Sequence, residues 1–253
     1  MRELAGSSVL VTGGGSGIGA GVARHFVALG ARVTVSGRRA EKVQAVADEL
    51  GEACLAVAAD VSVGADRQRL LDRALEHGGG LDTLVNAAGN TSKGALDTLD
   101  EAEMLNIYNT NVVGPVQLSG LALPALRASK GSIIFFGSVH TQRAFPGATA
   151  YAATKGALEA LTGVLAAELG PQQVRVNCVR PGGVYTELNE RAGFVTPEQA
   201  KARLQGLNAA HALGRTGTVD EVAEAVAYLA AAEWATGSIL TIDGGLALGV
   251  TQA

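Results

Sequence analysis

The sequence predicts an α/β fold in which helices cover both faces of a doubly wound parallel sheet of about seven strands. Short runs of apolar residues alternate along the whole chain with longer stretches that have helical spacing. The apolar runs are continuous, which is typical of strands buried on both faces. We find no linker, repeat or low-complexity segment between them, so we expect one domain over residues 1–253.

Each expected strand is a short apolar run rich in residues that favour extended structure. In chain order the strands are expected at Val9–Thr12, Arg32–Ser36, Cys54–Ala59, Thr83–Asn86, Ile133–Phe136, Val174–Val179 and Ile239–Ile242. The first stretch between them places Val22, Phe26 and Leu29 on one side of a helix. Helices are expected near Ala20–Leu29, Ala40–Leu50, Asp66–His77, Glu101–Leu126, Ala150–Leu169 and Val219–Ala231.

A glycine-rich loop, residues 13–19, joins the first expected strand to the first helix. Glycines there permit a tight turn and let backbone N–H groups approach a pyrophosphate at the helix N-terminus. A glycine-rich loop alone is equally compatible with a flexible turn. The flanking strand and helix favour a dinucleotide-binding unit, so we expect a Rossmann-type sheet.

Three polar residues further along the chain point to proton transfer. Ser138 ends an expected strand, Tyr151 follows it by thirteen positions, and Lys155 follows Tyr151 by four. A spacing of four places the phenol and the ammonium on one face of a helix. An ammonium there lowers the phenol pKa from about 10, which suits general acid–base catalysis. On its own the pair is also compatible with an ordinary helix surface.

Polar or glycine-containing segments follow six expected strands, where ligands bind in open α/β sheets. With their order along the chain, these motifs resemble those of the short-chain dehydrogenase/reductase family, in its single-domain branch. The resemblance covers nearly the whole chain and rests on Thr12–Gly19, Asp60-Val61, Asn86–Gly89, Asn111, Ser138, Tyr151 with Lys155, Pro181-Gly182, Leu213-Gly214-Arg215 and Asp243-Gly244-Gly245. It implies an oxidoreductase that transfers hydride between a nicotinamide cofactor and a carbonyl or alcohol carbon.

The resemblance also implies a set of cofactor contacts. They are Gly13, Ser16, Gly17, Ile18, Gly19, Arg38, Arg39, Asp60, Val61, Asn86, Ala87, Ala88, Gly89, Tyr151, Lys155, Pro181, Gly182, Val184 and Thr186. Asp60 is expected to contact the adenine, and residues 86–89 to line the adenosine ribose. Thr186 matches the family threonine that holds the nicotinamide carboxamide. Ala87 departs from the family's usual second asparagine.

The choice between NAD(H) and NADP(H) is expected to depend on the end of the second strand. An acidic residue there bonds the ribose hydroxyls of NAD and repels a 2′-phosphate, but Gly37 stands in its place, followed by Arg38 and Arg39. Arginine binds phosphate bidentately and keeps its charge. We predict NADP(H), with Arg38 as the main contact and Arg39 as a secondary one. The alternative is two arginines on a solvated helix start, and Ser16 occupies a position that is basic in some NADP-dependent relatives.

The family mechanism assigns roles to four residues. Ser138 and Tyr151 bond the substrate carbonyl oxygen, and Tyr151 donates the proton as the alkoxide forms. Lys155 lowers the pKa of Tyr151 and holds the nicotinamide ribose. Asn111 anchors a water in the proton relay, although alone it is compatible with a helix-surface amide.

The substrate pocket is expected to involve His140 and a lid at about residues 187–215. His140 either donates a hydrogen bond to substrate or faces solvent. Gly193 and Pro197 are expected to break helical structure in the lid, which contains Phe194, Leu204 and Leu207 among polar residues. The substrate stays open between a generic ketone or secondary alcohol and a 3-oxoacyl thioester, because the pattern is similar to 3-oxoacyl-thioester reductases.

Two hypotheses from other functional classes remain. One is a catalytically silent nucleotide-binding regulator, and the other is an epimerase or dehydratase of the longer related branch. The complete set of Asn111, Ser138, Tyr151 and Lys155 counts against the regulator. The second class usually has a larger carboxyl-terminal substrate domain, and residues 243–245 nearly end this sequence.

Composition and charge limit the classes of partner that can be expected. A net charge of −4 gives no electrostatic reason to expect nucleic acid or an anionic membrane. Cys54 and Cys178 lie in apolar runs and are expected to be buried free thiols, and no cysteine–histidine cluster has metal-ligand spacing. Without an apolar signal core or a long apolar stretch, we expect a soluble cytoplasmic protein. Family resemblance implies a homotetramer, or a dimer, formed through the long helices and the final strand.

Overall fold

The computed structural model describes residues 1–188 and 196–249, and its centre is a parallel sheet. Seven strands lie in the order β3-β2-β1-β4-β5-β6-β7. They are β1 (Ser8–Thr12), β2 (Arg32–Gly37), β3 (Cys54–Ala58), β4 (Thr83–Asn86), β5 (Ser132–Phe136), β6 (Arg175–Pro181) and β7 (Ile239–Ile242). The order reverses between β1 and β4, where the chain returns to the sheet centre and winds outward on the other side. The predicted doubly wound parallel sheet is confirmed.

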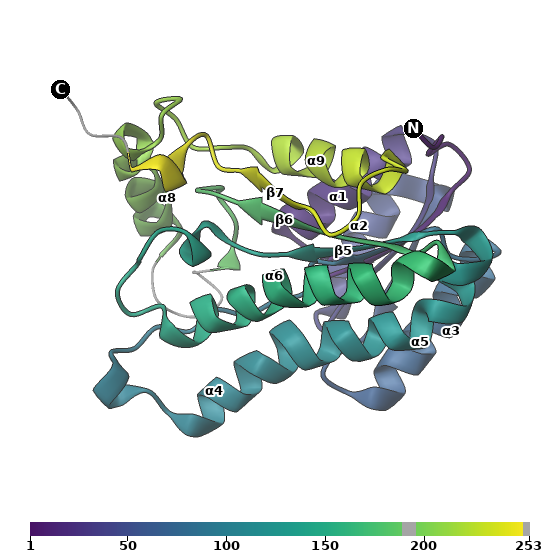
Figure 1. The fold of residues 1–253 in the computed structure, drawn as a ribbon, viewed down its shortest axis with the longest axis horizontal. Helices are drawn as coiled ribbons and strands as arrows, with labels where there is room; N and C mark the ends of the chain where they lie inside the picture. Colours follow the sequence, from purple (N-terminus) through teal and green to yellow (C-terminus); the bar gives the residue numbers. More distant parts are fainter. Residues whose placement is uncertain (189–195, 250–253) are drawn as a thin grey trace.

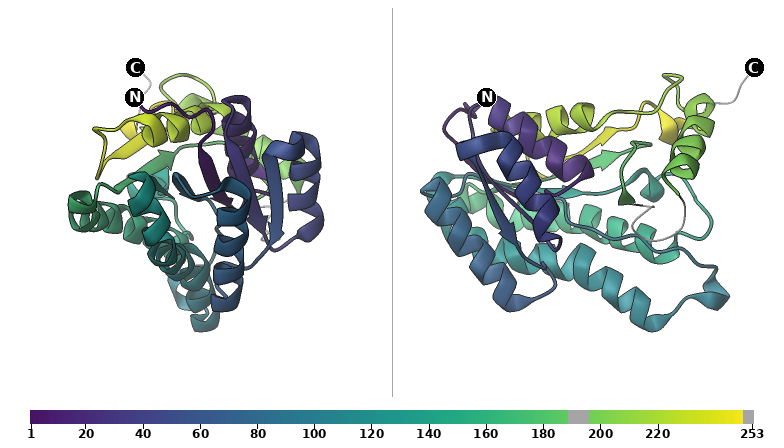
Figure 2. Two further views of the ribbon diagram at one scale, coloured as in Figure 1. Left: turned by 90° about the vertical axis from the view of Figure 1, so that its right-hand side faces the viewer. Right: turned by 180° about the vertical axis from the view of Figure 1, so that it is seen from behind.

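Helices cover the sheet on both faces (Figures 1 and 2). One layer contains α1 (Gly17–Ala28), α2 (Ala40–Leu50) and α9 (Val219–Ala231), and α1 packs along α9. The other contains α3 (Gly64–Gly78), α4 (Glu101–Tyr108), α5 (Gly114–Ser129) and α6 (Thr149–Leu169). A further helix, α8 (Pro197–Gly206), lies beyond the end of β6.

The core consists of two apolar layers, one on each face of the sheet. In β1, Val9 and Val11 face α1 and α9, whereas Leu10 between them faces α3 and α5. All three side chains are at most 1% exposed. Burial on both faces explains why the strands are continuous apolar runs instead of alternating apolar and polar residues.

The predicted helix over residues 101–126 is wrong in one respect, because a π-helical turn at Asn109–Val113 separates α4 from α5. Within this turn the N–H of Gly114 bonds the carbonyl of Asn109. Pro115 follows, and a proline has no N–H to bond the carbonyl four residues earlier, so the regular ladder is interrupted there. The wide turn carries Asn111 into the interior.

Pro197 begins a helix instead of breaking one, which corrects a second expectation. Thr196 caps α8: its hydroxyl accepts the Gln199 N–H, while the Gln199 side chain bonds the Thr196 N–H. Proline is favoured in the first helical turn because the N–H that it lacks has no partner there. Gly193 and Phe194 of the predicted lid lie outside the described residues.

Two further expectations concern cysteines and membranes. Cys54 and Cys178 are both buried free thiols, as predicted. Within the described ranges, no helix has the length and apolar character needed to cross a bilayer.

Candidate active site

A cavity of about 610 Å³ lies at the carboxyl ends of the strands, beside the point where the strand order reverses. The predicted site residues that line it are Gly13, Ser16, Gly17, Ile18, Gly19, Arg38, Asp60, Val61, Ala87, Ala88, Gly89, Ser138, His140, Tyr151, Lys155, Pro181, Gly182, Val184 and Thr186. They come from the loops that follow six strands, from the first turn of α1 and, for Tyr151 and Lys155, from α6. Three predicted residues, Arg39, Asn86 and Asn111, are not part of the lining.

The glycine loop brings bare backbone to the wall of this cavity. Gly13 has a φ of +68°, and a Cβ on it would lie 2.7 Å from the Ala87 carbonyl oxygen. A Cβ on Gly19 would collide with the carbonyl of Gly13. The loop can therefore fold tightly against the end of β4 only with glycine at these positions. The N-terminus of α1 then opens into the cavity, as a pyrophosphate site requires.

Arg38 lies at the cavity end that the loops after β2 and β3 form. Its Nη2 donates to Oδ1 of Asn90 at 3.3 Å. Asp60 follows β3, and its Oδ1 accepts hydrogen bonds from the N–H and hydroxyl of Ser62 at 2.9 and 2.7 Å. This end thus presents one guanidinium and one carboxylate, the pair expected near an adenosine.

Arg39 is turned to a different partner. Its Nη2 lies 3.1 Å from the Ser16 hydroxyl and 3.1 Å from the Glu187 carboxylate, and Lys42 lies 3.6 Å from the same carboxylate. Ser16 and Glu187 both line the cavity. The second predicted arginine is therefore already paired with an anion of the protein.

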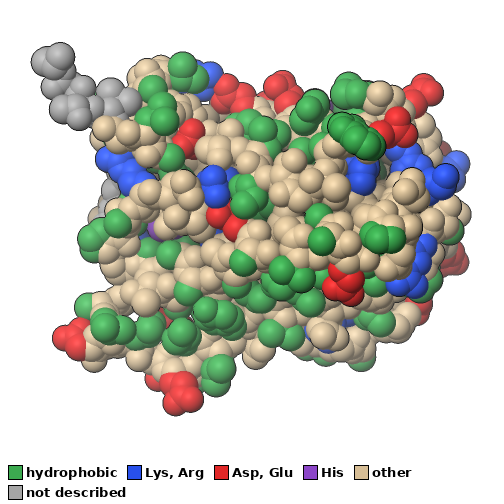
Figure 3. Space-filling model, in the orientation of Figure 1, with side chains coloured by type: hydrophobic (Ala, Val, Ile, Leu, Met, Phe, Trp, Pro, Cys, Tyr) green, Lys and Arg blue, Asp and Glu red, His purple; other side chains and the backbone are tan. Residues whose placement is uncertain are grey.

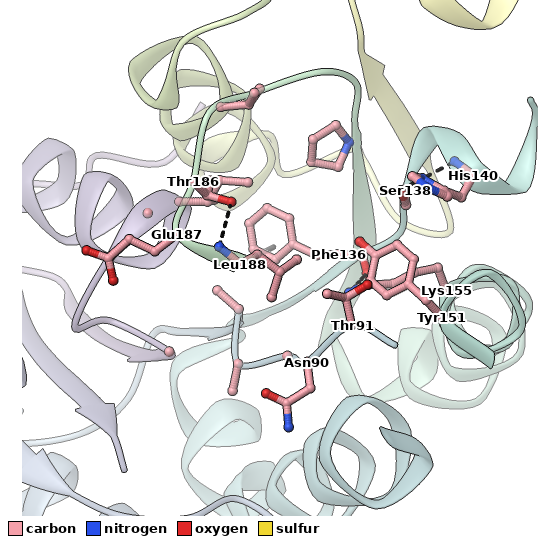
Figure 4. Close-up of a pocket in the computed structure, with 18 of the residues that line it drawn as sticks. Asn90, Thr91, Phe136, Ser138, His140, Tyr151, Lys155, Thr186, Glu187 and Leu188 are labelled. Atoms are coloured by element: carbon pink, nitrogen blue, oxygen red, sulfur yellow. Dashed lines mark hydrogen bonds between the residues drawn. The ribbon is translucent and has the colours of Figure 1, made fainter. Parts of the chain in front are cut away.

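Tyr151 and Lys155 stand one turn apart on α6, as their spacing predicts, and meet Ser138 at the end of β5. In Figure 4 these side chains and His140 lie together, across from Thr186, Glu187 and Leu188. The Lys155 ammonium donates to the Phe136 carbonyl at 3.0 Å and lies 5.6 Å from the centre of the Tyr151 ring. A hydroxyl, a phenol and an ammonium therefore share one wall.

The ionisation of this trio differs from the expectation. Burial raises the pKa of Tyr151 above its usual value, and the hydrogen bond with Ser138 opposes this only in part. Burial also lowers the pKa of Lys155 to about 8. The predicted net lowering of the Tyr151 pKa is wrong for this structure, because loss of hydration disfavours the phenolate more than the hydrogen bond with Ser138 favours it. Tyr151 is therefore a protonated donor at neutral pH.

Ser138 also contacts a histidine. Its Oγ lies 3.0 Å from Nδ1 of His140 and accepts the His140 N–H at 3.3 Å. The imidazole stacks on Phe145, with centroids 4.3 Å apart, and meets the Tyr151 ring edge-on at 5.2 Å. Burial, with a smaller effect of Lys93, lowers the pKa of His140 to about 4, so the ring is neutral at neutral pH.

Asn111 and Asn86 are buried behind the cavity. Asn111 accepts the Asn90 N–H at 2.8 Å and donates to the Asn90 carbonyl at 2.9 Å and to the Thr154 hydroxyl at 3.0 Å. It thereby ties the loop after β4 to α6. Asn86 donates to Ser119 on α5 at 3.2 Å, so its side chain faces a helix and not the cavity, contrary to the expected ribose contact.

Comparison with known proteins decides the family. A family model described as enoyl-(acyl carrier protein) reductase matches residues 13–247. The chain belongs to the short-chain dehydrogenase/reductase family. It is therefore an oxidoreductase with a nucleotide-binding fold, as predicted.

Relatives within this family differ in their substrates. The chain is 40% identical to a putative ketoacyl reductase of the granaticin polyketide synthase of Streptomyces violaceoruber, with 93% of this chain and 94% of that one covered. It is 37% identical to L-fucose dehydrogenase of Bos taurus, with 98% and 92% covered. A solved 3-ketoacyl-(acyl-carrier-protein) reductase from Brucella melitensis, complexed with NADH, superposes with a TM-score of 0.88 at 32% identity, covering 96% and 99% of the two chains.

Several lining residues of this short-chain dehydrogenase/reductase were not predicted. Polar ones include Asn90, Thr91, Ser92 and Lys93, which directly follow the motif at residues 86–89. Their position after β4 could have predicted that they line the cavity. Apolar ones include Phe136, Phe145 and Leu246. The described part of the predicted lid contributes Glu187, Leu188, Leu204 and Leu207 to the cavity lining.

Proposed function

We propose that this enzyme interconverts a ketone and a secondary alcohol with NADP(H), and that Tyr151 is its general acid and base. The observation that carries this proposal is the meeting of Ser138, Tyr151 and Lys155 on one wall of a cavity whose other end is the glycine loop. One cavity of about 610 Å³ accommodates a cofactor and the carbonyl group of a substrate side by side.

The residues around the glycine loop fit a dinucleotide. The bare backbone of Gly13 and Gly19 leaves room for a pyrophosphate at the start of α1. Thr186 lies beside Gly17, since a Cβ on that glycine would come 3.2 Å from its side chain. We assign Asp60 to the adenosine end and Thr186 to the nicotinamide end. When bound there, the cofactor supplies or accepts the hydride.

The protein's own part is proton transfer. Tyr151 is protonated at neutral pH, so it can donate to a carbonyl oxygen that gains negative charge during reduction. Ser138 supplies a second hydrogen bond to that oxygen and helps to fix its position. Below a pH of about 8 the Lys155 ammonium is charged and stabilises the phenolate that remains. In the oxidation direction Tyr151 takes the proton back.

The preference for NADP(H) is supported by Arg38. This guanidinium lines the cavity just after β2, where Gly37 replaces an acidic residue. The Brucella melitensis relative is complexed with NADH, and that observation favours NAD(H) instead. The pairing of Arg39 with Glu187 leaves Arg38 as the arginine available to a 2′-phosphate.

The apolar part of the cavity lining favours 3-oxoacyl thioesters as the substrate class to test first. It includes Phe145, Leu188, Leu204, Leu207 and Leu246. Apolar side chains suit a hydrocarbon chain better than a hydroxyl-rich sugar, whose polar groups need partners. We assign the neutral His140, beside Ser138, to a second oxygen of the substrate.

We also propose a homotetramer. Figure 3 shows hydrophobic side chains gathered along α4 and α6, and Leu105, Val113 and Val164 are 58%, 45% and 61% exposed. Trp234 before β7, Ile239 at its start and Leu248 after it are also exposed apolar residues. Large exposed apolar areas mark association surfaces. Light scattering that shows a monomer at micromolar concentration would contradict this.

The function is tested by initial rates of NADPH and NADH oxidation with 3-oxoacyl thioesters, cyclic ketones, steroid ketones, diketones and sugars. Saturable turnover of the 3-oxoacyl thioesters, faster with NADPH, is the expected result. Turnover of sugars alone would overturn the substrate class, and equal rates with both cofactors would overturn the role of Arg38.

A further inference from the structure

A buried ion pair lies directly behind Ser138. Arg180 on β6 and Glu159 on α6 make two parallel bonds, from Nε to Oε1 at 2.9 Å and from Nη2 to Oε2 at 2.7 Å. Their side chains are only 12% and 9% exposed. Arg180 also donates to the Thr241 hydroxyl on β7 at 3.0 Å. The pair thus joins α6, β6 and β7 behind the reacting groups.

The Glu159 carboxylate supports the turn on both sides of Ser138. Its Oε1 accepts the Thr141 hydroxyl at 2.9 Å, and the same hydroxyl lies 2.8 Å from the Ser138 carbonyl oxygen. On the other side the carboxylate lies against Gly137, where an added Cβ would collide with Oε1. The residue before Ser138 and the residue three positions after it therefore both rest on Glu159.

The same carboxylate acts on Lys155, one helical turn earlier on α6. Burial lowers the pKa of Lys155, and the groups that oppose this are Cys178 on β6 and Glu159. Burial raises the pKa of Cys178 to about 11, so this thiol is neutral at neutral pH. Tyr151, which faces Lys155 from α6, is also neutral there. Among the groups described around Lys155, Glu159 is the one that is negatively charged.

We propose that Glu159, held in place by Arg180, is a positioning residue: it fixes the turn that carries Ser138 and places a carboxylate one turn of α6 from the Lys155 ammonium. The inference rests on the proposed function of Ser138 and Lys155 and extends it to a pair outside the cavity lining. A buried ion pair gains little net stability over apolar side chains of similar volume, because both charges lose their hydration. Stability alone therefore does not account for the pair, whereas positioning of the turn that carries Ser138 does.

The test compares Glu159→Gln, Arg180→Met and the double variant. Each single change leaves one buried charge unpaired, so the melting temperature falls, whereas the double variant removes both charges and recovers most of it. For the double variant we expect kcat for carbonyl reduction to stay on the order of 10–100-fold below wild type. In Glu159→Gln, which keeps the Arg180 cation, the alkaline fall of the pH–rate profile should move to lower pH, because Lys155 loses the nearby anion that holds its proton. The KM for the cofactor should change little.

A matched control is available at the surface. Arg24 and Glu49 form an equally bidentate pair with distances of 2.7 Å, but both are about half exposed and join α1 to α2. The double variant Arg24→Met with Glu49→Gln should leave kcat and the pH profile unchanged. If the Glu159 and Arg180 double variant regains wild-type kcat and pH profile together with its melting temperature, the pair is merely structural and the proposal is overturned.

Two further measurements keep the proposal testable if the charge variants do not fold or no substrate turns over. Thr141→Val removes the hydroxyl between Glu159 and the Ser138 carbonyl without changing a charge. We therefore expect kcat to fall, while the pH at which the rate declines on the alkaline side stays the same. The side-chain 13C signal of Lys155, assigned with Lys155→Met, gives its pKa without any substrate. A pKa that is unchanged by Glu159→Gln would overturn the electrostatic role, whatever the fate of the proposed function.

Discussion

The Arg39 guanidinium lies 3.1 Å from the Glu187 carboxylate, although 148 positions separate the two residues in the chain. The contact joins the start of α2, beside the expected adenosine end, to the first residues of the predicted lid. Arg38, one position earlier, instead lines the cavity and bonds Asn90. Two adjacent arginines thus face different partners. The proposed contact with the 2′-phosphate of NADP(H) is therefore assigned to Arg38 and not to Arg39.

Replacing Arg38 by glutamate should reverse the cofactor preference. A carboxylate after β2 repels a 2′-phosphate and can bond the ribose hydroxyls of NAD(H). We expect the ratio of kcat/KM for NADPH to that for NADH to fall by about 100-fold or more, from a lost charge-assisted pair and a new repulsion. Equal NADPH affinity in wild type and Arg38→Glu would contradict the assignment.

Replacing Glu187 by glutamine should strengthen NADPH binding. The change frees the positive charge of Arg39 and Lys42 near the cavity while nearly preserving side-chain volume. Because the pair is over one-third exposed, the gain should be modest, about two- to fivefold in Kd by calorimetry, with NADH affinity unchanged. Glu49→Gln, on the far end of α2, is the control and should change neither affinity.

The rate of carbonyl reduction should fall as pH rises through about 8, the pKa of buried Lys155. Lys155 is charged below this pH and neutral above it, so support for the Tyr151 phenolate is lost on the alkaline side. Tyr151 cannot cause this limb, since its own pKa is raised. The profile of kcat/KM against pH reports groups of the free enzyme. A flat profile between about pH 7 and pH 10 would contradict the burial of a titrating lysine.

His140 should make the fold sensitive to acid. Its pKa is about 4 in the folded protein and about 6.5 when unfolded, so the unfolded state binds more protons between these values. The contribution of this residue to stability is complete above about pH 6.5 and declines towards pH 4, by about 1–2 kcal/mol once solvent screening of the partly exposed ring is taken into account. Denaturant unfolding of His140→Asn should show a shallower decline over this range. An identical decline in both proteins would assign the sensitivity to other groups.

Local patterns in the sequence were sufficient to predict the sheet and most of the site. The glycine loop and the pair of Tyr151 and Lys155 can each be recognised from a few neighbouring residues. The parallel topology then brings the carboxyl ends of the strands to one edge of the sheet. The bounds of α2 and α9 match the predicted ranges, because the apolar spacing along a helix is a local property of the sequence.

What the sequence did not predict depends on contacts between distant residues. The pairing of Arg39 with Glu187 exists only once the segments after β2 and β6 meet, and the support of Ser138 by Glu159 exists only once β5 and α6 lie together. Asn86 faces α5 because side chains alternate along β4, so that Asn86 points to the same helix layer as Leu84. The raised pKa of Tyr151 follows from burial, which spacing on a helix does not reveal.

The central claim is that Tyr151 transfers the proton, and Tyr151→Phe tests it most directly. The change removes one oxygen atom from the cavity wall and leaves the ring, so the fold and the cofactor site should persist. We predict that kcat for reduction falls at least about 100-fold while the Kd for NADPH stays within about threefold. Tyr228→Phe, at an exposed position on α9, should behave as wild type. Turnover by Tyr151→Phe at close to the wild-type rate would contradict the mechanism.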